Sequence, residues 1–484
     1  MTDIRTQPTI YEINTPIFLA EISQLKGQPI TLATVPHRYW DELAEQGIDA
    51  VWFMGVWQRS PIARDMATGE PWLRKALPDM TDEDLLGSAY SIKDYVVETS
   101  LGGNDGLAEA RAQLEKRGIG IILDYVPNHV AIDHAWATEH PEYLLLGSES
   151  ELFAHPDAFF EMNGKVFAKA KDPNFAPWSD VLQVNAFSQA LRQEVAHTLQ
   201  SIAEMCDGVR CDMAMLMMNK VFKQTWGERV GEVPDEDYWP EIIRAVREVR
   251  PDFLFLAEVY WDKEKDLLKQ GFDLCYDKHL YDHLLEGSAE VVKKYIEQPR
   301  QYQNHLLRFI ENHDEKRAAD AYPFQKHIAA AVVMATLPGA HLYHDGQREG
   351  RQLQVPVHLG RRVDEVPNDI IKLFYRKLLK FTSSVSLYQH HWKQVKIITG
   401  LLHTGLLHTE STQILAWVWT NKDSRFLVCV NYSPKAAHGS IDLNTSKAHS
   451  AVQLTGGPML LSHVLDDGHL KLQPWQHVII ELHK

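Results

Sequence analysis

Cysteine is scarce in this chain of 484 residues, and none of its four cysteines stands in a CxxC pair. Zinc ribbons and redox dithiols use such paired spacing, so neither is expected. A chain of this length can build its core without disulfide bonds. We therefore expect buried free thiols at Cys206, Cys211, Cys275 and Cys429.

Long apolar runs and an excess of basic residues are also missing. The longest apolar run, Ile328 to Ala335, is far shorter than the ~20 residues of a membrane helix, and the N-terminal segment has no apolar leader. Acidic residues number 65 against 49 lysines and arginines, which gives a formal net charge of -16. Nucleic acid and membranes are therefore not expected as partners, and we predict a cytoplasmic protein.

Short β-rich apolar runs recur along the chain, separated by segments of helical periodicity such as Asp105–Arg117 and Ala186–Met205. This alternation is typical of βα units and predicts a parallel sheet. Eight such runs predict an α/β fold, a closed (β/α)8 TIM barrel, with catalytic residues at the C-terminal ends of the strands. The predicted strands are Thr9–Ile13, Asp49–Met54, Gly120–Val126, Gly208–Met213, Phe253–Val259, Phe272–Tyr276, Leu307–Asn312 and Ala340–Asp345.

Two further stretches do not fit a simple barrel. Residues 130–185 follow the third strand and far exceed the usual ~2–6 residues of a βα loop, which predicts a small inserted subdomain. Beyond Lys396, alternating β-branched and aromatic segments predict a C-terminal antiparallel β-sandwich over residues 396–484. The expected catalytic domain spans residues 1–395 and includes the insertion.

Four acidic residues, Asp124, Asp212, Glu258 and Asp314, end or directly follow apolar runs, so they converge in a barrel. Hydrolysis of a glycoside with retention needs two carboxyl groups roughly 5–5.5 Å apart. Arg210 and Asp212 are two residues apart and point to the same side of a strand, so the guanidinium can keep this carboxylate ionised. Glu258 follows the apolar FLFLA, a setting that can raise its pKa into the range of a general acid.

The segments DYVPNH, GVRCDMA, AEVY and NHD, in this order, resemble the signature segments of the alpha-amylase family, glycoside hydrolase family 13. The resemblance implies that Asp212 is the nucleophile, Glu258 the acid/base and Asp314 the residue that stabilises the transition state. It also implies a double displacement through a covalent glucosyl-enzyme.

The same resemblance implies residues that bind the attacked sugar. Asp124, His129 and His313 match the family's sugar subsite, and Arg210 matches the partner of the nucleophile. In GSAYSIKDY, Tyr90 matches the aromatic residue that stacks on the reactive sugar. No cofactor is predicted, and no metal either, because the family's first-segment asparagine alone gives too few oxygen ligands for calcium.

Some positions differ from family members that cleave long α-glucans. Those members often carry a Lys-His pair where this chain has Met215 and Leu216, which cannot donate hydrogen bonds to a glucose unit. Arg317 in NHDEKR is similar to members that clamp a terminal sugar in a closed pocket. Trp261 is expected on the leaving-group side, and the loop Asp65–Leu85 over the pocket entrance.

Together these patterns predict a retaining α-glycoside hydrolase that removes a terminal α-glucosyl unit from a short α-glucoside, either a disaccharide or a glucosylated polyol. One alternative is an α-glucosyltransferase or phosphorylase of the same fold, because another acceptor can intercept the covalent intermediate. An α-amylase acting on maltodextrins and a non-catalytic carbohydrate-binding relative are the others. The aglycone, the linkage and the oligomeric state stay open.

Overall fold

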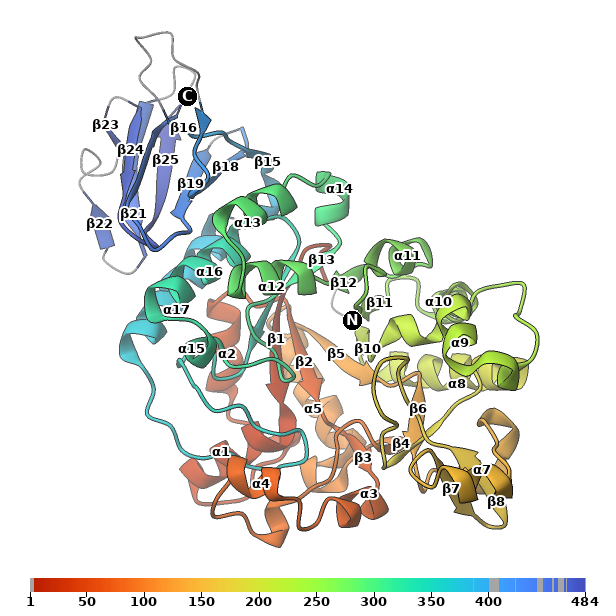
Figure 1. The fold of residues 1–484 in the computed structure, drawn as a ribbon. Coiled ribbons are helices and arrows are strands. Elements are labelled where there is room, and N and C mark those ends of the chain that lie inside the picture. The colour runs from red at the N-terminus through yellow and green to blue at the C-terminus, as the bar shows by residue number, and fades with distance from the viewer. Residues whose placement is uncertain are drawn as a thin grey trace.

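A closed parallel barrel of eight strands forms the centre of the molecule, as predicted (Figure 1). The computed structural model describes residues 4–385, 387–399, 409–422, 424–441, 447–454, 457–459, 465–466 and 468–483. Strands pair in parallel in chain order, and the last closes on the first. They are β1 (Thr9–Asn14), β2 (Ala50–Met54), β5 (Gly120–Tyr125), β10 (Gly208–Cys211), β11 (Leu254–Ala257), β12 (Leu274–Tyr276), β13 (Leu306–Arg308) and β14 (Ala340–His344).

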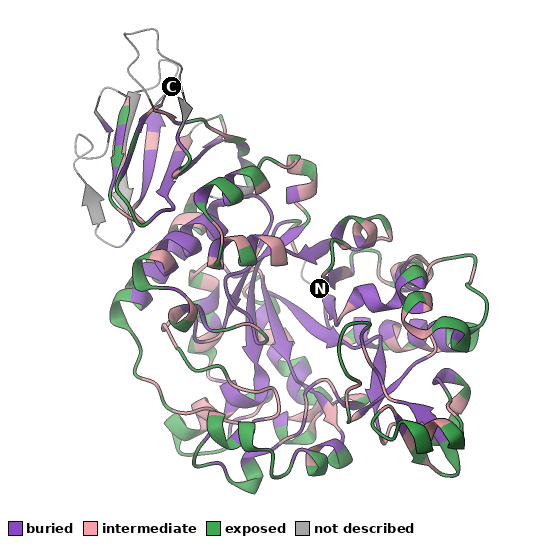
Figure 2. Cartoon of the chain, viewed as in Figure 1, coloured by how far each residue is buried: buried purple, intermediate pink, exposed green. Residues whose placement is uncertain are grey.

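Helices surround the barrel, and Figure 2 shows buried strands inside helices whose outer faces are exposed. Side-chain caps set several boundaries. The Ser188 hydroxyl accepts the Leu191 amide at the start of α8 (Gln189–Met205), and Asp277 accepts the Leu280 amide at the start of α12 (Lys278–Leu285). The other long helices are α1 (Thr15–Lys26), α2 (His37–Glu45), α5 (Gly103–Glu115), α10 (Tyr238–Val249), α13 (Ala289–Tyr295), α16 (Phe324–Thr336) and α17 (Asp369–Val385).

Shorter elements occupy the connections at the C-terminal end of the barrel. After β2 the chain forms an antiparallel pair and two short helices, and after β5 it forms two antiparallel pairs. The interior of the barrel is filled with side chains, so the insertions extend from the ends of the strands. They are β3 (Trp57–Arg59), α3 (Pro61–Met66), α4 (Pro71–Ala76) and β4 (Ile92–Val97), then β6 (His129–Ala131), α6 (Trp136–Glu139), α7 (Glu149–Ala154), β7 (Phe159–Met162), β8 (Lys165–Ala168) and β9 (Val181–Gln183).

Short helices also follow the later strands. They lie in the loops after β10, β11, β12 and β13, where the chain leaves the C-terminal end of the barrel or returns to its other end. These helices are α9 (Asn219–Trp226), α11 (Glu264–Lys269), α14 (Arg300–Gln303) and α15 (Ala318–Ala321).

The C-terminal part forms two antiparallel sheets, as predicted. Residues Ile414, Leu427, Leu470 and Ile480 belong to an apolar cluster shared by the two sheets, which therefore pack as a sandwich. One sheet contains β15 (His391–Gln394), β18 (Ile414–Thr420), β19 (Arg425–Asn431), β25 (His477–His483), β21 (Lys447–Gln453) and β22 (Gly457–Met459). The other contains β17 (Thr409–Glu410), β16 (Ile398–Thr399), β20 (Ala437–Ser440), β24 (His469–Leu472) and β23 (Leu465–Asp466).

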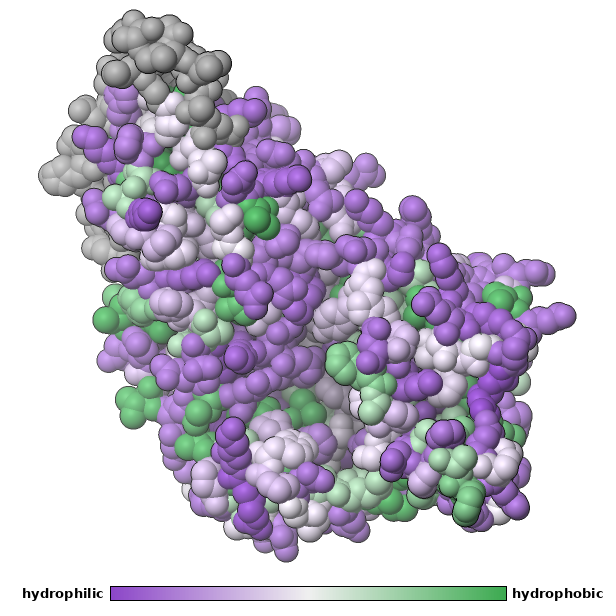
Figure 3. Space-filling model, in the orientation of Figure 1, coloured by the Kyte–Doolittle hydropathy of each residue, from purple (hydrophilic) through white to green (hydrophobic). Residues whose placement is uncertain are grey.

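The polarity of the surface and the state of the cysteines match what the composition indicated. The face seen in Figure 3 is mostly hydrophilic, with scattered hydrophobic residues, and it is hollowed between the barrel and the part that carries β6 to β9. All four cysteines are buried and unpaired, as predicted. Within the described part of the chain, no helix combines the length and apolar character needed to cross a membrane.

Candidate active site

The predicted carboxylates meet around Arg210, which lies fully buried on β10 at the C-terminal end of the barrel. Its Nη1 is 2.8 Å from Oδ1 of Asp212 and 3.4 Å from Oδ1 of Asp124. Its Nη2 is 2.8 Å from Oε2 of Glu258 and 3.9 Å from Oδ2 of Asp314. Burial lowers the pKa of Arg210, but Glu258 and Asp212, with the nearby tyrosine hydroxyls, outweigh it and raise the pKa above its usual value, so the guanidinium stays charged.

The backbone links the two central carboxylates. Asp212 directly follows β10, and the next residue, Met213, has a left-handed φ of 43°, which is uncommon for a residue other than glycine. This turn aims the Met213 amide at Oε2 of Glu258, to which it donates at 2.7 Å. The Glu258 amide in turn donates to the Cys211 carbonyl at 3.0 Å. Asp212 and Glu258 are therefore fixed relative to each other.

Three of the carboxyl groups differ in their protonation. Burial raises the pKa of Glu258 to about 7, because Asp212 and Asp314 add to it and Arg210 only partly opposes it. Burial also raises the pKa of Asp212, against the attraction of Arg210. Desolvation of its carboxyl within the site acts to raise the pKa of Asp314, but His313 and Arg210 outweigh this effect and lower the pKa to about 2. Carboxyl groups whose pKa values differ in this way are suited to separate acid and base roles.

His313 connects a second set of residues beside this group. Its Nδ1 is 2.5 Å from Oε1 of Glu12, on β1, and its Nε2 is 2.6 Å from the Tyr90 hydroxyl and 3.1 Å from Oδ2 of Asp314. The Tyr90 ring stacks on the imidazole, with centroids 5.4 Å apart. Burial opposes a charge on His313, but Asp314 and Glu12 raise its pKa well above the usual value. His313 is therefore an imidazolium.

Asp124 and His129 occupy neighbouring buried positions. Burial raises the pKa of Asp124 to about 6, although Arg210 opposes it, and the Trp52 indole donates to its Oδ2 at 3.1 Å. Burial lowers the pKa of His129 to about 4, so its ring is neutral near pH 7. The His129 ring lies 5.2 Å from that of Trp178.

A pocket of about 450 Å³ lies beside Tyr260, which is two residues after Glu258. Its walls include Met213, Tyr260, Trp261 and Lys278, together with Phe175 from the segment after β5. Tyr260 donates from its hydroxyl to Oε1 of Glu258 at 2.8 Å, and this contact joins the pocket to the carboxyl group. We call this space the leaving-group pocket, after the side of the substrate predicted for Trp261.

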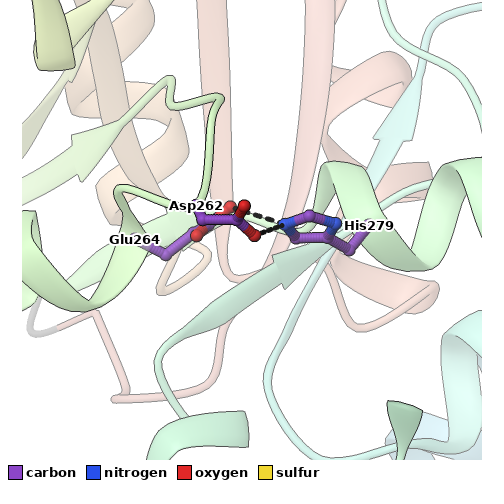
Figure 4. A group of neighbouring side chains, drawn as sticks. All are labelled: Asp262, Glu264 and His279. Atoms are coloured by element: carbon purple, nitrogen blue, oxygen red, sulfur yellow. Dashed lines mark ion pairs between the residues drawn. The ribbon is translucent and has the colours of Figure 1, made fainter.

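An ion-pair cluster at the rim of this pocket fixes the loop after β11. Asp262 and Glu264 both face His279 of α12 (Figure 4), with Nε2 of His279 2.9 Å from Asp262 and 3.6 Å from Glu264. Trp261 and Asp262 have left-handed φ values of 61° and 57°. These contacts tie the loop that carries Trp261 to α12.

A sequence model described as "Alpha amylase, catalytic domain" matches residues 39–366, about two thirds of the chain. The chain belongs to the alpha-amylase family. The matched residues contain all four strand-end carboxylates and the long connections after β2 and β5. The match begins after β1 and ends after β14, so it covers the other seven strands of the barrel together with the insertions.

Two curated relatives and one solved structure illustrate the similarity. α-Amylase MalA of Haloarcula japonica is 25% identical over 372 residues, which are 73% of this chain and 45% of the relative. α-Amylase 3 of Dictyoglomus thermophilum is 21% identical over 348 residues, 66% of this chain and 62% of the relative. The crystal structure of an α-amylase from Lactobacillus plantarum is 20% identical, with a TM-score of 0.69 over 99% of this chain and all of the other. That structure supports the fold alone.

The structure brings most of the residues predicted from the alpha-amylase segments into one connected group. Trp261 is 37% exposed and lines the same pocket as Tyr260. The roles of these residues stay a prediction. The connected residues are Tyr90, Asp124, Arg210, Asp212, Glu258, His313 and Asp314.

Arg317 does not join this group. It is buried, its Nη1 is 3.1 Å from Oε1 of Glu311, and its Nη2 donates to the Asp345 carbonyl at 2.8 Å. His344 also contacts the guanidinium. Because these internal partners engage both terminal nitrogens, the structure gives no support to the prediction that Arg317 binds a sugar.

Several residues of the site were not predicted from the family's segments. Glu12 contacts His313, Tyr260 contacts Glu258, and the Tyr276 hydroxyl accepts a hydrogen bond from Nε of Arg210 at 3.3 Å. Glu12 had a signal, because it is the one charged residue of TIYEIN and every residue of that strand is buried. A charge within a buried run needs a partner. The two tyrosines had no such signal.

Proposed function

We propose that this protein is a retaining α-glycoside hydrolase that removes a terminal α-glucosyl unit from a short α-glucoside. The observation that carries the proposal is the contact of one guanidinium, Arg210, with both Asp212 and Glu258. A retaining mechanism needs two carboxyl groups close together, one ionised and one protonated. The raised pKa of Glu258, about 7, supports the role of acid for this residue.

The proposed reaction has two steps. In the first, a carboxylate oxygen of Asp212 attacks the anomeric carbon while Glu258 gives its proton to the glycosidic oxygen, and the aglycone leaves. In the second, Glu258 takes a proton from water, the water oxygen attacks the anomeric carbon, and Asp212 is released. Arg210 donates a hydrogen bond to Oδ1 of Asp212 and is proposed to keep this contact in both steps.

Asp314 and His313 are proposed to bind the hydroxyl groups of the reacting sugar. Asp314 is ionised at neutral pH because its pKa is about 2, and a charged acceptor binds hydroxyl donors strongly. Tyr90 stacks on His313 and is proposed to present its ring to the sugar. Positive charge develops on the sugar in the transition state, so the nearby carboxylate stabilises it.

The preference for a terminal glucosyl unit is supported by a wall at the end of the site. The loops after β2 and β14 join there: the Arg59 guanidinium donates to the carbonyls of Gly87 and Val357, and the Leu86 amide donates to the His358 carbonyl. Both loops flank β1, which carries Glu12 on the sugar side of the site. We propose that these joined loops close the sugar end of the site, so that a single sugar fits there.

The leaving-group side supports a small aglycone. Met215 and Leu216 are 0% and 2% exposed, so neither can contact a leaving sugar. A maltodextrin would therefore lack contacts from these two positions. The second candidate function is α-amylase activity on maltodextrins, which is favoured by the names of the two curated relatives.

Proton NMR of the first anomer released separates these functions. Wild type is incubated with sucrose, maltose, isomaltose, trehalose, glucosylglycerol and soluble starch, with and without phosphate. Asp212→Asn tests the nucleophile. Asp273→Asn, at the opposite end of the barrel, is the matched control. We expect α-glucose from one or more of the short glucosides, no product with Asp212→Asn, and near wild-type activity with Asp273→Asn.

Other products would change the conclusion. β-Glucose as the first product would refute the double displacement. Oligomers released from starch would refute the terminal-unit preference and favour the α-amylase. Glucose 1-phosphate formed only with phosphate would favour a phosphorylase.

A further inference from the structure

The two carboxylate oxygens of Glu258 lie in different surroundings. Oε2 is 2.8 Å from Nη2 of Arg210, an ion pair that lacks hydrogen-bond geometry, and it accepts the Met213 amide at 2.7 Å. Oε1 accepts the Tyr260 hydroxyl at 2.8 Å. A proton on Oε2 would face a guanidinium and an N–H donor, which cannot accept it, whereas a proton on Oε1 would face only the neutral Tyr260 hydroxyl, which can also accept a hydrogen bond. The acidic proton is therefore favoured on Oε1.

We propose that Oε1 of Glu258 carries and delivers the catalytic proton, and that Tyr260 is the positioning residue for this oxygen. This inference rests on the proposed function. Tyr260 lines the leaving-group pocket, and its hydroxyl contacts Oε1, so Oε1 is the oxygen of Glu258 that is linked to this pocket. The glycosidic oxygen must lie between the sugar and the leaving group. Oε1 therefore meets it from the correct side.

The Tyr260 hydroxyl is a hydrogen-bond donor to Oε1 once this oxygen has lost its proton. Burial raises the pKa of Tyr260 well above its usual value, and the nearby Glu258 adds to this shift, so the phenol keeps its proton at neutral pH. When Oε1 gives its proton to the glycosidic oxygen, the C1–O bond breaks and Oε1 becomes an anion. The Tyr260 O–H bond then points at the new charge, and Tyr260 itself neither gains nor loses a proton.

The loop geometry holds Tyr260 in this position. The residues that follow it, Trp261 and Asp262, adopt left-handed conformations, and Asp262 and Glu264 are anchored to His279 of α12 (Figure 4). Tyr260 therefore sits between a strand end and an anchored turn. An ordered donor is what a positioning role requires.

Other charged or titratable groups around Glu258 come from several elements. They are Arg210 and Asp212 at the end of β10, Asp314 after β13, and Tyr276 of β12. Tyr260→Phe leaves all of them in place. A change in Glu258 in this variant therefore reports on the hydroxyl group alone.

Infrared difference spectroscopy measures the protonation of Glu258 without any activity assay. The carboxyl band that is lost in Glu258→Gln is titrated in wild type and in Tyr260→Phe. A donor stabilises the anion, so its removal should raise the pKa of Glu258 by about one unit. Tyr432→Phe, which removes a buried hydroxyl that donates to the Leu284 carbonyl, is the matched control and should leave this pKa unchanged. An unchanged pKa in Tyr260→Phe would overturn the proposal.

Kinetics then test the delivery of the proton. We expect kcat/KM of Tyr260→Phe to fall about 10- to 100-fold on a short glucoside with a poor leaving group. With α-glucosyl fluoride, whose leaving group needs no proton, the fall should be much smaller. An equal loss on both substrates would indicate only a structural role for Tyr260. If wild type cleaves neither substrate, the proposed function fails, while the infrared titration still decides whether Tyr260 holds Oε1.

Discussion

Two buried cations organise the site at the scale of single residues. Arg210 contacts Asp212 and Glu258, and His313 contacts Glu12 and Asp314. Unpaired buried charges would be too costly, so each cation balances carboxylates from different strands. The differences in pKa among these carboxylates follow from this pairing.

The pH dependence of kcat/KM should show a basic limb near pH 7. Glu258 must be protonated to act as an acid, and burial raises its pKa to about 7, so activity persists below this pH and falls above it. Activity should also fall at acid pH, because Asp212 must be ionised to act as the nucleophile. Burial raises the pKa of Asp212 above 3.8, so this fall should begin above pH 3.8. The measurement is kcat/KM on a short α-glucoside over about five pH units, centred slightly below pH 7. A basic limb near 4.5 would contradict this prediction.

Replacement of Glu12 by Gln should weaken both catalysis and stability. His313 loses one of the two anions that keep it charged, so we expect kcat/KM to fall about 10- to 100-fold, the size of one hydrogen bond between charged groups. Glu241→Gln, whose partner Arg192 lies outside the site, is the control and should keep its activity.

The stability difference between wild type and Glu12→Gln should depend on pH. The pKa of His313 is raised above 6.5, so its contribution is complete below that pH and is lost as the pH rises through the raised value. The pKa of Glu12 is lowered from 4.5 despite its burial, so its contribution is present above 4.5 and is lost on acidification. Unfolding by urea should therefore show the largest difference from pH 4.5 to 6.5 and somewhat above. A stability difference between the two proteins that does not vary with pH would contradict the ion pair between Glu12 and His313.

At the scale of elements, the connection after β2 and the connection after β14 act as one unit. The Gly360 amide donates to the Asp84 carbonyl, and Arg361 pairs with Asp84 at 2.7 Å. A separate apolar cluster beneath these contacts contains Leu73, Leu85 and Leu359. Because this cluster is distinct from the main core, it can loosen without unfolding the barrel.

Leu359→Ala should open the wall at the end of the site. Removal of a fully buried leucine side chain costs about 2–5 kcal/mol, and the loss should fall on this local cluster. We expect a higher KM for the short glucoside with a smaller change in kcat, and faster hydrogen exchange in residues 59–89 and 353–363. Leu353→Ala, which truncates a half-exposed leucine in the same loop, is the control. Exchange that rises equally over the whole barrel would contradict local opening.

At the scale of the whole molecule, the C-terminal sandwich is packed onto the barrel. The Trp419 indole donates to the Thr336 carbonyl of α16 at 2.8 Å, and the Tyr432 hydroxyl donates to the Leu284 carbonyl of α12 at 2.5 Å. Trp417 and Val428 belong to the same apolar cluster as the barrel. One face of this sheet therefore continues the core of the catalytic domain.

Trp419→Ala should destabilise the whole molecule without changing the chemistry. Truncation of a buried tryptophan costs about 3–5 kcal/mol, so the melting temperature should fall while kcat/KM of the folded protein stays the same. Circular dichroism and residual activity should be lost in one coincident transition. Phe153→Ala, at a residue that is 92% exposed, is the control. Two separate transitions would show that the sandwich unfolds independently.

The order of apolar runs was enough to predict the barrel and its eight strands. Each strand is buried on both faces, so it must be apolar over its length, and this property is visible locally in runs such as FLFLA. The four carboxylates were visible for the same reason, because each lies at the end of such a run or a few residues after it. The prediction for Arg317 lacked this basis, since spacing alone cannot show which partner a guanidinium finds.

The sequence by itself determined the fold class, the family and the position of the four carboxylates, because these depend on local patterns and on their order. Only the tertiary structure decided that Glu311 engages Arg317, that Glu12 holds His313 from a strand 301 residues away, and that Tyr260 contacts one oxygen of Glu258. It also decided that the loops after β2 and β14 join. The physical reason is that each of these features needs side chains or loops to meet in space, and closure of the barrel brings together residues whose separation along the chain carries no local signal.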